Sequence, residues 1–145
     1  DQLMNIREAF KGNNLILVTN QSEIKGRLID IQKIYYVKNP PKPIGFGLDI
    51  FSLIFNCIRI ILPCIKILYK EKPDIIIGCG GEPTLIMSYL GKLTGVRVIF
   101  IESLTRIHDL SPCGKLVIYI TDLFLVQWKG LAHKYKKASY WGKVV

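Results

Sequence analysis

The sequence predicts an α/β fold with a parallel, doubly wound sheet in one domain, residues 1–145. Short apolar runs that suit buried strands alternate with longer segments that suit helices from residue 15 to residue 141. Continuous apolar runs outnumber alternating ones, which is typical of parallel strands covered on both faces. A glycine loop joins one of these strands to a helix at residues 78–84.

The N-terminal part predicts a short helix followed by two strands. The helix is expected to end at Gly12, and the apolar runs 15–19 and 34–37 predict the strands. The proline-rich stretch 39–43 then ends the second strand. Because such a domain normally begins with a strand, we expect this Rossmann-like sheet to lack its first strand, which is central in the order 3-2-1-4-5.

The longest predicted helix covers residues 48–70 and is apolar around more than half of its circumference. Its polar positions are three or four residues apart and form one narrow stripe. One interpretation is burial between the sheet and neighbouring helices, and the other is contact of the outer side with a membrane interface. Charges and Pro63 inside the helix disfavour a transmembrane span. The candidate membrane residues are Phe51, Phe55, Arg59 and Lys66.

A β-α-β unit over residues 73–103 predicts a ligand-binding loop. The buried strand 74–78 leads through Gly80 and Gly81 into a helix, which Pro83 suits because its fixed φ favours the first turn. Free amides at a helix start can hold a phosphate or diphosphate. The alternative is a tight turn only, because the loop matches neither a Walker nor a dinucleotide fingerprint. The candidate binding residues are Gly80, Gly81, Pro83 and Thr84.

The end of the next strand carries the candidate catalytic residue, Glu102. Ligands of parallel sheets bind at the carboxyl ends of strands, where this carboxylate can orient an acceptor hydroxyl. The alternative is an ion pair with Arg106, which can instead bind phosphate, and Ser103 is a further acceptor-binding candidate. The rest of the chain predicts helices over 112–121 and 130–135 and strands over 122–127 and 138–141.

The composition of the chain favours some classes of binding partner over others. Half of the residues are hydrophobic, yet the formal net charge is +9, a combination that favours an anionic membrane surface or a phosphorylated ligand. Nucleic acid is disfavoured because exposed aromatics do not interleave with arginines. The four cysteines have no metal-ligand spacing, and no cofactor is predicted.

Several motifs in the second half share an order that is more specific than any one of them. In chain order they are Ile101-Glu102-Ser103 with Arg106, the segment Ser-Pro-Cys-Gly-Lys-Leu at 111–116, the segment 121–128 and the segment 140–145. Together they resemble the acceptor-binding, membrane-associated subunit of two-component UDP-sugar transferases. This is the asparagine-linked glycosylation subunit fourteen family, with bacterial and archaeal relatives in polysaccharide biosynthesis.

The resemblance implies the N-terminal half of a split GT-B glycosyltransferase. A separate UDP-sugar-binding catalytic subunit would supply the donor, such as UDP-N-acetylglucosamine, and the acceptor would be a lipid-diphosphate-linked sugar. It also implies the cytoplasmic face of a membrane, reached peripherally or through an anchor upstream of Asp1. The family's opening Gly-Gly-His loop is absent from this sequence, and residues 79–83 depart from its usual Gly-Pro-Gly arrangement.

The apolar C-terminal tip predicts a partner interface, formed by Trp141, Val144 and Val145. The alternative is that the tip folds back on its own sheet. Two other functional classes remain open. One is a non-catalytic membrane scaffold. The other is a small nucleotide-dependent Rossmann enzyme, which would require a glycine fingerprint at the first strand.

Overall fold

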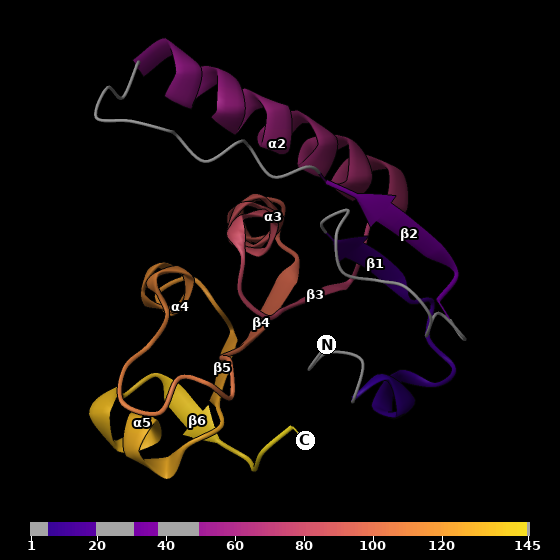
Figure 1. The fold of residues 1–145 in the computed structure, drawn as a ribbon. Helices are drawn as coiled ribbons and strands as arrows, with labels where there is room; N and C mark the ends of the chain where they lie inside the picture. The colour runs from indigo at the N-terminus through magenta and orange to yellow at the C-terminus, as the bar shows by residue number, and fades with distance from the viewer. Residues whose placement is uncertain (1–5, 20–30, 38–49, 145) are drawn as a thin grey trace.

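The computed structural model describes residues 6–19, 31–37 and 50–144, and Figure 1 shows their arrangement. Strands and helices alternate as the sequence predicts, and the strand bounds agree within one or two residues. The helix expected over 112–121 is shorter and ends at Val117. In chain order, the elements are η1 (Arg7–Phe10), β1 (Ile16–Thr19), β2 (Lys33–Tyr36), α2 (Ile50–Glu71), β3 (Ile75–Gly78), α3 (Glu82–Leu93), β4 (Arg97–Ile101), α4 (Pro112–Val117), β5 (Leu123–Val126), α5 (Lys129–Lys134) and β6 (Ala138–Tyr140).

All strand pairs are parallel, which confirms the α/β class, but the strands form two separate sheets. Among the strands in the described ranges, β1 pairs only with β2, and the second sheet has the order β3-β4-β5-β6. A groove of about 820 Å³ lies between the two sheets. Residues of β1, β3 and β4 line it, including Ile16, Leu17, Ile75, Ile77 and Ile99.

Helix α2 joins the two sheets through a shared core. Its buried residues Cys64 and Ile67 belong to a cluster that Val18 of β1 and Ile76 of β3 also contact. The second cluster lies between β4 to β6 and the helices α4 and α5. It contains Phe100, Leu110, Val117, Ile118, Phe124, Val126, Leu131 and Ala138.

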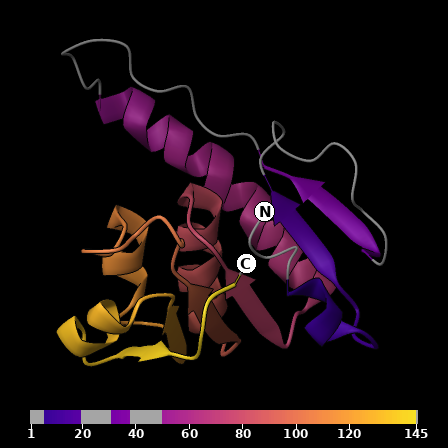
Figure 2. The ribbon, with the colours of Figure 1, turned by 60° about the horizontal axis from the view of Figure 1, so that its bottom comes forward.

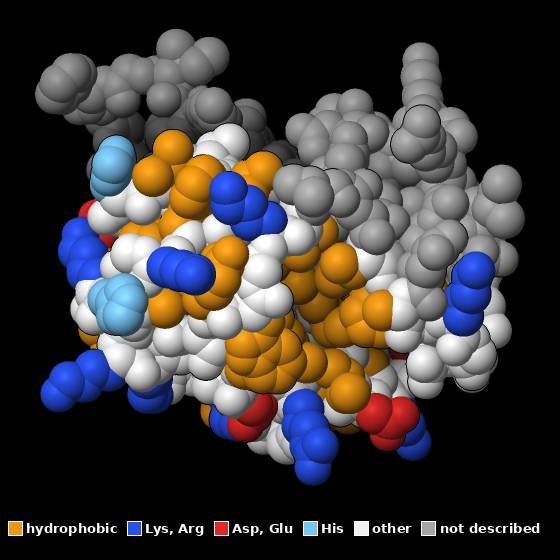
Figure 3. All heavy atoms as spheres, turned by 90° about the horizontal axis from the view of Figure 1, so that it is seen from below, with side chains coloured by type: hydrophobic (Ala, Val, Ile, Leu, Met, Phe, Trp, Pro, Cys, Tyr) orange, Lys and Arg blue, Asp and Glu red, His pale blue; other side chains and the backbone are white. Residues whose placement is uncertain are grey.

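The two faces of the four-stranded sheet differ in burial. Val98, Phe100 and Phe124 point into the helix-covered face and are almost fully buried. Right-handed crossovers that all move in one direction place their helices on one face, and the core clusters agree with this. On the opposite face, Ile77 and Ile99 are only half-buried, although Ile101 at the end of β4 is buried. Figure 3 shows hydrophobic side chains at the surface on the side seen from below. Helices on both faces were expected, so the structure matches that expectation on one face.

Candidate functional site

The carboxyl ends of β3, β4 and β5 bring three connecting segments together at one edge of the sheet. These are the glycine loop before α3, the loop 102–111 before α4 and the short turn before α5. The segment after β6 also runs back toward the middle of the molecule (Figures 1 and 2). The Sγ atom of Cys113, in the first turn of α4, lies 3.5 Å from the carbonyl oxygen of Gly81 and links the glycine loop to α4.

The glycine loop has a backbone that favours glycine at two positions. Gly80 has φ +69° and Gly81 has φ +82°, in the left-handed region where other residues are strained. A Cβ atom on Gly80 would meet no atom of the described residues within 4 Å, so among these residues the loop has open space beside it.

The start of α3 offers backbone donors beside that open space. No side chain in the described part of the chain caps this end of the helix, and its first turn contains Pro83. The amide of Leu85 donates to the Gly81 carbonyl. Within the described residues, the preceding amides of Glu82 and Thr84 have no backbone acceptor. Such amides suit an anionic group.

Gly78 and Gly91 hold α3 close to β3. A Cβ atom on Gly78 would lie 2.2 Å from Thr84 Cγ2, and one on Gly91 would lie 2.2 Å from Ile76 Cδ1. Both distances are shorter than van der Waals contact. Close packing therefore fixes the position of the loop and of the helix start.

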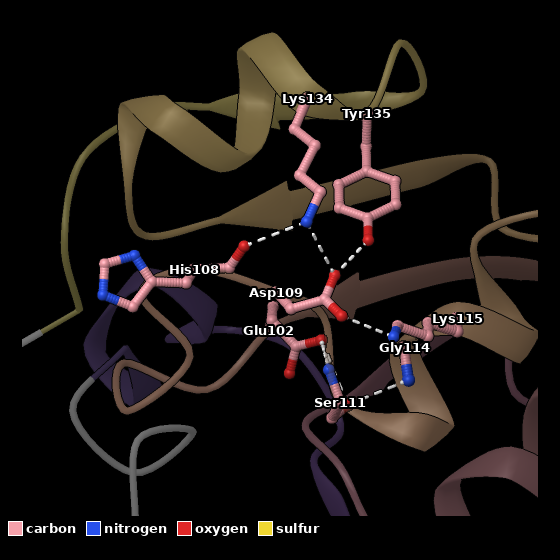
Figure 4. Close-up of polar contacts among 8 residues, drawn as sticks. All are labelled: Glu102, His108, Asp109, Ser111, Gly114, Lys115, Lys134 and Tyr135. Carbon is pink, nitrogen blue, oxygen red and sulfur yellow. Dashed lines mark hydrogen bonds and ion pairs between the residues drawn. The ribbon is translucent and has the colours of Figure 1, made fainter.

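Glu102 is buried, with 1% of its surface exposed. Its Oε1 accepts a hydrogen bond from the Ser103 amide at 2.9 Å. Its Oε2 accepts from the Ser111 amide at 2.9 Å and the Ser111 hydroxyl at 3.0 Å. The Ser111 hydroxyl in turn accepts from the Gly114 amide and caps α4 (Figure 4). The carboxylate thus ties the end of β4 to the start of α4.

Ser103 and Arg106 share the loop after β4, as the sequence suggested. The Ser103 hydroxyl and the Thr105 hydroxyl lie 2.9 Å apart, and the Arg106 amide donates to the Ser103 carbonyl. Arg106 is exposed. Among the residues that the structure describes, no ion pair joins it to Glu102, whose hydrogen-bond donors come from the two serines. The expected alternative of a Glu102–Arg106 pair is therefore not seen.

Asp109 anchors the same loop to α4 and α5. Its carboxylate accepts hydrogen bonds from Lys115 at 2.5 Å, from Lys134 at 3.2 Å and from the Tyr135 hydroxyl (Figure 4). These donors, Lys115 first, hold the pKa of Asp109 well below its usual range. The same contacts raise the pKa values of Lys115 and Tyr135. Lys134 also donates to the His108 carbonyl, so part of the basic run around residue 134 has a structural contact.

Sequence reasoning missed Gln127, which lies directly after β5. Its side chain is 1% exposed and makes two hydrogen bonds. Its Nε2 donates to the Glu102 carbonyl at 2.8 Å, and its Oε1 accepts from the Val144 amide at 2.8 Å. No sequence signal identifies these partners, because they depend on the path of the C-terminal segment.

Sequence reasoning also assigned no role to Ser111 and Gly114. A Cβ atom on Gly114 would lie 2.1 Å from Glu102 Oε2, so only glycine fits this position without movement of the carboxylate. Here a signal was available. Serine directly before proline is the pattern of a helix N-cap followed by proline at the first helical position.

The C-terminal tip is partly exposed. Trp141 has 74% of its surface exposed. Val144 is half-buried, and its amide contacts Gln127. Val145 lies outside the described residues. Trp141 therefore lies in solvent, whereas Val144 is held by the hydrogen bond of its backbone amide.

The outer side of α2 combines apolar and basic residues. Ile58, Leu62 and Tyr69 are exposed large hydrophobic residues, and Arg59 and Lys66 on the same helix are exposed as well. The side chains of Phe51 and Phe55 lie outside the described part of the structure. Within that part, no helix is both long and apolar enough to cross a membrane.

No group of three His, Cys, Asp or Glu side chains suited to a metal ion occurs in the described ranges 6–19, 31–37 and 50–144. The cysteines described there, Cys64, Cys79 and Cys113, are not in disulfides. Burial raises the pKa of the Cys64 thiol to about 11 and also raises that of Cys79.

Comparison with known proteins identifies the family. The model of the family described as "Oligosaccharide biosynthesis protein Alg14 like" matches residues 20–144. The chain belongs to this family. The match includes α2, the glycine loop and all of the residues around Glu102. The resemblance seen in the sequence is thereby confirmed.

Individual Alg14-like relatives agree with the family match. The UDP-N-acetylglucosamine transferase subunit ALG14 of Debaryomyces hansenii is 40% identical over 107 residues, which cover 68% of this chain and 46% of the relative. The human protein of the same name is 29% identical over 119 residues, covering 77% and 54%. The Schizosaccharomyces pombe protein is 28% identical over 161 residues, covering 99% and 72%. The chain thus spans about half the length of the first two relatives.

Proposed function

We propose that this Alg14-like chain is the acceptor-binding, membrane-facing part of a glycosyltransferase of GT-B architecture. A separate catalytic subunit binds the UDP-sugar, and N-acetylglucosamine or a related sugar is transferred to a lipid-diphosphate-linked acceptor. The relatives' description as UDP-N-acetylglucosamine transferase subunits supports both the donor and the need for a partner. The observation that carries the proposal is that the start of α4 contacts both the glycine loop, through Cys113, and Glu102, through Ser111, at one sheet edge.

The diphosphate of the acceptor binds at the start of α3. Gly80 leaves open space there among the described residues, and the amides of Glu82 and Thr84 provide donors. Pro83 fixes the first turn of the helix. Arg106 and Ser103, in the neighbouring loop, add a positive charge and a hydroxyl. Anion binding at this edge also agrees with the net charge of +9.

Glu102 acts as a positioning residue in this account. Its carboxylate already accepts three hydrogen bonds and is buried. It therefore orients Ser103 and the start of α4, and through them the acceptor. A direct catalytic role for Glu102 stays a prediction that transfer kinetics of a Glu102→Gln variant would test.

The exposed side of α2 lies on the cytoplasmic face of a membrane. Positions 51, 55, 58 and 62 are three or four residues apart and so share one side of the helix. Ile58 and Leu62 on that side are exposed, and Arg59 and Lys66 lie beside them. Apolar residues flanked by basic residues favour an anionic interface. Phe51 and Phe55 extend this membrane contact toward the helix start.

The groove between β1 and β3 is the place of the first, central strand that the sequence analysis expects to be missing. Aliphatic side chains of β1, β3 and β4 line the groove together with polar residues such as Lys33 and Glu71. Helix α2 packs against both β1 and β3. Among the described strands, β1 and β3 each have only one neighbour. A strand between them would satisfy both free edges and restore the doubly wound order.

The donor-binding partner docks at the C-terminal tip. Trp141 is highly exposed for a tryptophan, and large aromatic residues are enriched in interfaces. Val144 and Val145 follow it in the sequence. This interface places the donor next to the carboxyl edge of the sheet, where the acceptor binds.

Ligand binding by the full-length protein on anionic vesicles tests this function. Without a partner, the protein should bind a lipid-diphosphate-N-acetylglucosamine acceptor but not UDP-N-acetylglucosamine. Arg106→Gln should weaken acceptor binding about tenfold, the effect of losing one charge-assisted contact of about 1.4 kcal/mol. Arg97→Gln is the matched control, because Arg97 is also exposed but lies at the opposite end of β4. Donor binding without the partner, or equal effects of the two substitutions, would contradict the proposal.

The scaffold alternative gives a different result in the same experiment. A protein that only recruits its partner would bind the partner and the vesicles but show no saturable acceptor binding.

A further inference from the structure

Two consecutive residues after β5 contact the same two segments of the chain. Gln127 donates from Nε2 to the Glu102 carbonyl and accepts at Oε1 from the Val144 amide, both at 2.8 Å. Its side chain is almost completely buried. If one of the two segments moved, the Gln127 amide could keep its hydrogen bond to that segment only by breaking the bond to the other. This would leave a buried polar group unpaired, which is costly.

Trp128 joins the same two segments through a hydrogen bond of its indole and a cation–π contact. Its Nε1 donates to the Leu104 carbonyl at 2.8 Å. The Nζ atom of Lys143 lies 4.0 Å from the centroid of its ring, in the range of a cation–π contact. One side of the indole thus contacts the loop after β4, and its face contacts the C-terminal segment.

Both contacted segments lack regular secondary structure. Residues 102–106 and 141–144 contain no helix or strand. Their positions therefore depend on contacts of this kind and not on a sheet ladder or a helix. The contacts of Gln127 and Trp128 join the segment proposed for partner docking to the loop that carries Ser103 and Arg106.

We propose that Gln127 and Trp128 act as a clamp that couples partner docking at the C-terminal segment to the position of the acceptor-binding loop. The clamp rests on the proposed function and assigns these two residues a positioning role within it. Partner binding holds residues 141–144, the clamp then favours one position of Ser103 and Arg106, and the acceptor binds more tightly. Coupling between binding sites is reciprocal, so the acceptor must raise the partner's affinity by the same factor.

The test measures that coupling factor with the full-length protein and its partner subunit. Partner affinity is determined on vesicles with and without saturating lipid-diphosphate-N-acetylglucosamine. Wild type should show at least about fivefold tighter partner binding with acceptor, the lower end of typical couplings. Trp128→Phe removes the indole donor but keeps an aromatic ring, and Gln127→Met keeps the length of the side chain without its hydrogen bonds.

Both variants should bring the coupling factor close to one. They should also raise the acceptor KM by the factor that is lost, while kcat at saturating acceptor stays within about twofold. Tyr140→Phe is the matched control. It is an aromatic change at the end of β6, and its hydroxyl makes no hydrogen bond within the described part of the chain. Its coupling factor should equal that of wild type.

The outcomes separate the two proposals. If the wild-type complex binds no acceptor, the proposed function and the clamp both fail. If the complex binds acceptor but shows no coupling in wild type, or keeps full coupling in folded Trp128→Phe and Gln127→Met variants, the clamp alone is wrong. Loss of coupling in the two variants but not in Tyr140→Phe supports it.

Discussion

The four-stranded sheet and the two-stranded sheet differ in the side-chain contacts that hold their strands in place. In the larger sheet, β4 is held by a carboxylate near each end. Asp122 accepts from the Val98 amide at 2.8 Å and from Lys92 at 2.5 Å, and Glu102 ties the other end to α4. In the smaller sheet, the corresponding contact is Glu71 of α2, which accepts from Lys33 at 2.8 Å and from the Tyr35 hydroxyl.

The difference concerns burial as much as hydrogen bonding. Phe100 and Phe124 are fully buried in the larger sheet, whereas every residue of β1 is only half-buried. Local stability follows buried apolar contacts. The candidate acceptor site belongs to the larger sheet, which we expect to be the more rigid of the two. The smaller sheet contacts it mainly through the core around α2. Under the proposed function, acceptor positioning and membrane attachment therefore reside in different parts of one fold.

Gly114→Ala should have the largest effect, because it disturbs the Glu102 contacts that hold the larger sheet. The new Cβ atom would lie 2.1 Å from Glu102 Oε2 and 3.1 Å from the Ser111 Oγ atom, so it displaces a buried carboxylate. Overpacking and a lost buried hydrogen bond together should cost about 3 kcal/mol of unfolding free energy. Chemical denaturation measures this change.

Gly130→Ala provides the control for that substitution. Gly130 lies in α5, and a Cβ atom there would meet nothing within 4 Å. Alanine should change stability by less than about 1 kcal/mol, in the stabilising direction. Equal losses from the two substitutions would show that the Glu102 contacts do not make the larger sheet rigid.

Native-state hydrogen exchange should separate the sheets directly. Amides of β2, such as Tyr35, should exchange on the order of a hundredfold faster than those of β4, such as Phe100, because local opening exposes them without global unfolding. Mass spectrometry of exchanged peptides gives the comparison. Uniform protection of both sheets would mean that α2 makes them one cooperative unit.

Vesicle binding should depend on the part of the molecule that contains α2. Arg59→Gln combined with Lys66→Gln removes two exposed charges, each worth about 1 kcal/mol near an anionic surface. Binding to vesicles with acidic lipid should fall roughly thirtyfold. In the matched control, Lys136→Gln with Lys137→Gln, the change is made at the basic run beside α5 and should have little effect. A reversed order of effects would assign the membrane contact to α5.

Acid should have the smallest effect, and it should act through two hydrogen-bonded carboxylates, Glu71 beside the smaller sheet and Asp109 beside the larger one. The pKa of Glu71 is lowered by its bonds with Lys33 and Tyr35, and that of Asp109 by Lys115 and Tyr135. A lowered pKa means that stabilisation is complete above the unfolded value of about 4 and is lost as pH falls below it. Stability measured between pH 5 and pH 3 should therefore fall less in Glu71→Gln and Asp109→Asn than in wild type. An identical acid response in all three proteins would show that these contacts contribute nothing.

Much of this architecture could be predicted because local signals agree with the fold. Apolar runs identified the strands, and Pro83 after two glycines identified the start of α3. The position of Glu102 at the end of a buried strand was also correct. These features depend on residues close together in the sequence.

The remainder depends on distant contacts. The carboxylate of Glu102 bonds Ser111, nine residues later, and its carbonyl accepts from Gln127, 25 residues later. Those partners are set by how β4, α4 and β5 pack, which no local pattern contains. The sequence also did not predict the early end of α4 or the half-buried face of the larger sheet. Both depend on tertiary packing, which overrides local propensity.

Sugar transfer in a reconstituted system tests the central claim most directly. The full-length protein on anionic vesicles is supplied with UDP-N-acetylglucosamine and a lipid-diphosphate-N-acetylglucosamine acceptor, first alone and then with the donor-binding partner subunit. The account predicts no transfer by the protein alone and transfer by the complex, with the rate reduced by Arg106→Gln and unaffected by Arg97→Gln. Sustained transfer by the protein without its partner would contradict the claim that it supplies only the acceptor half of the active site.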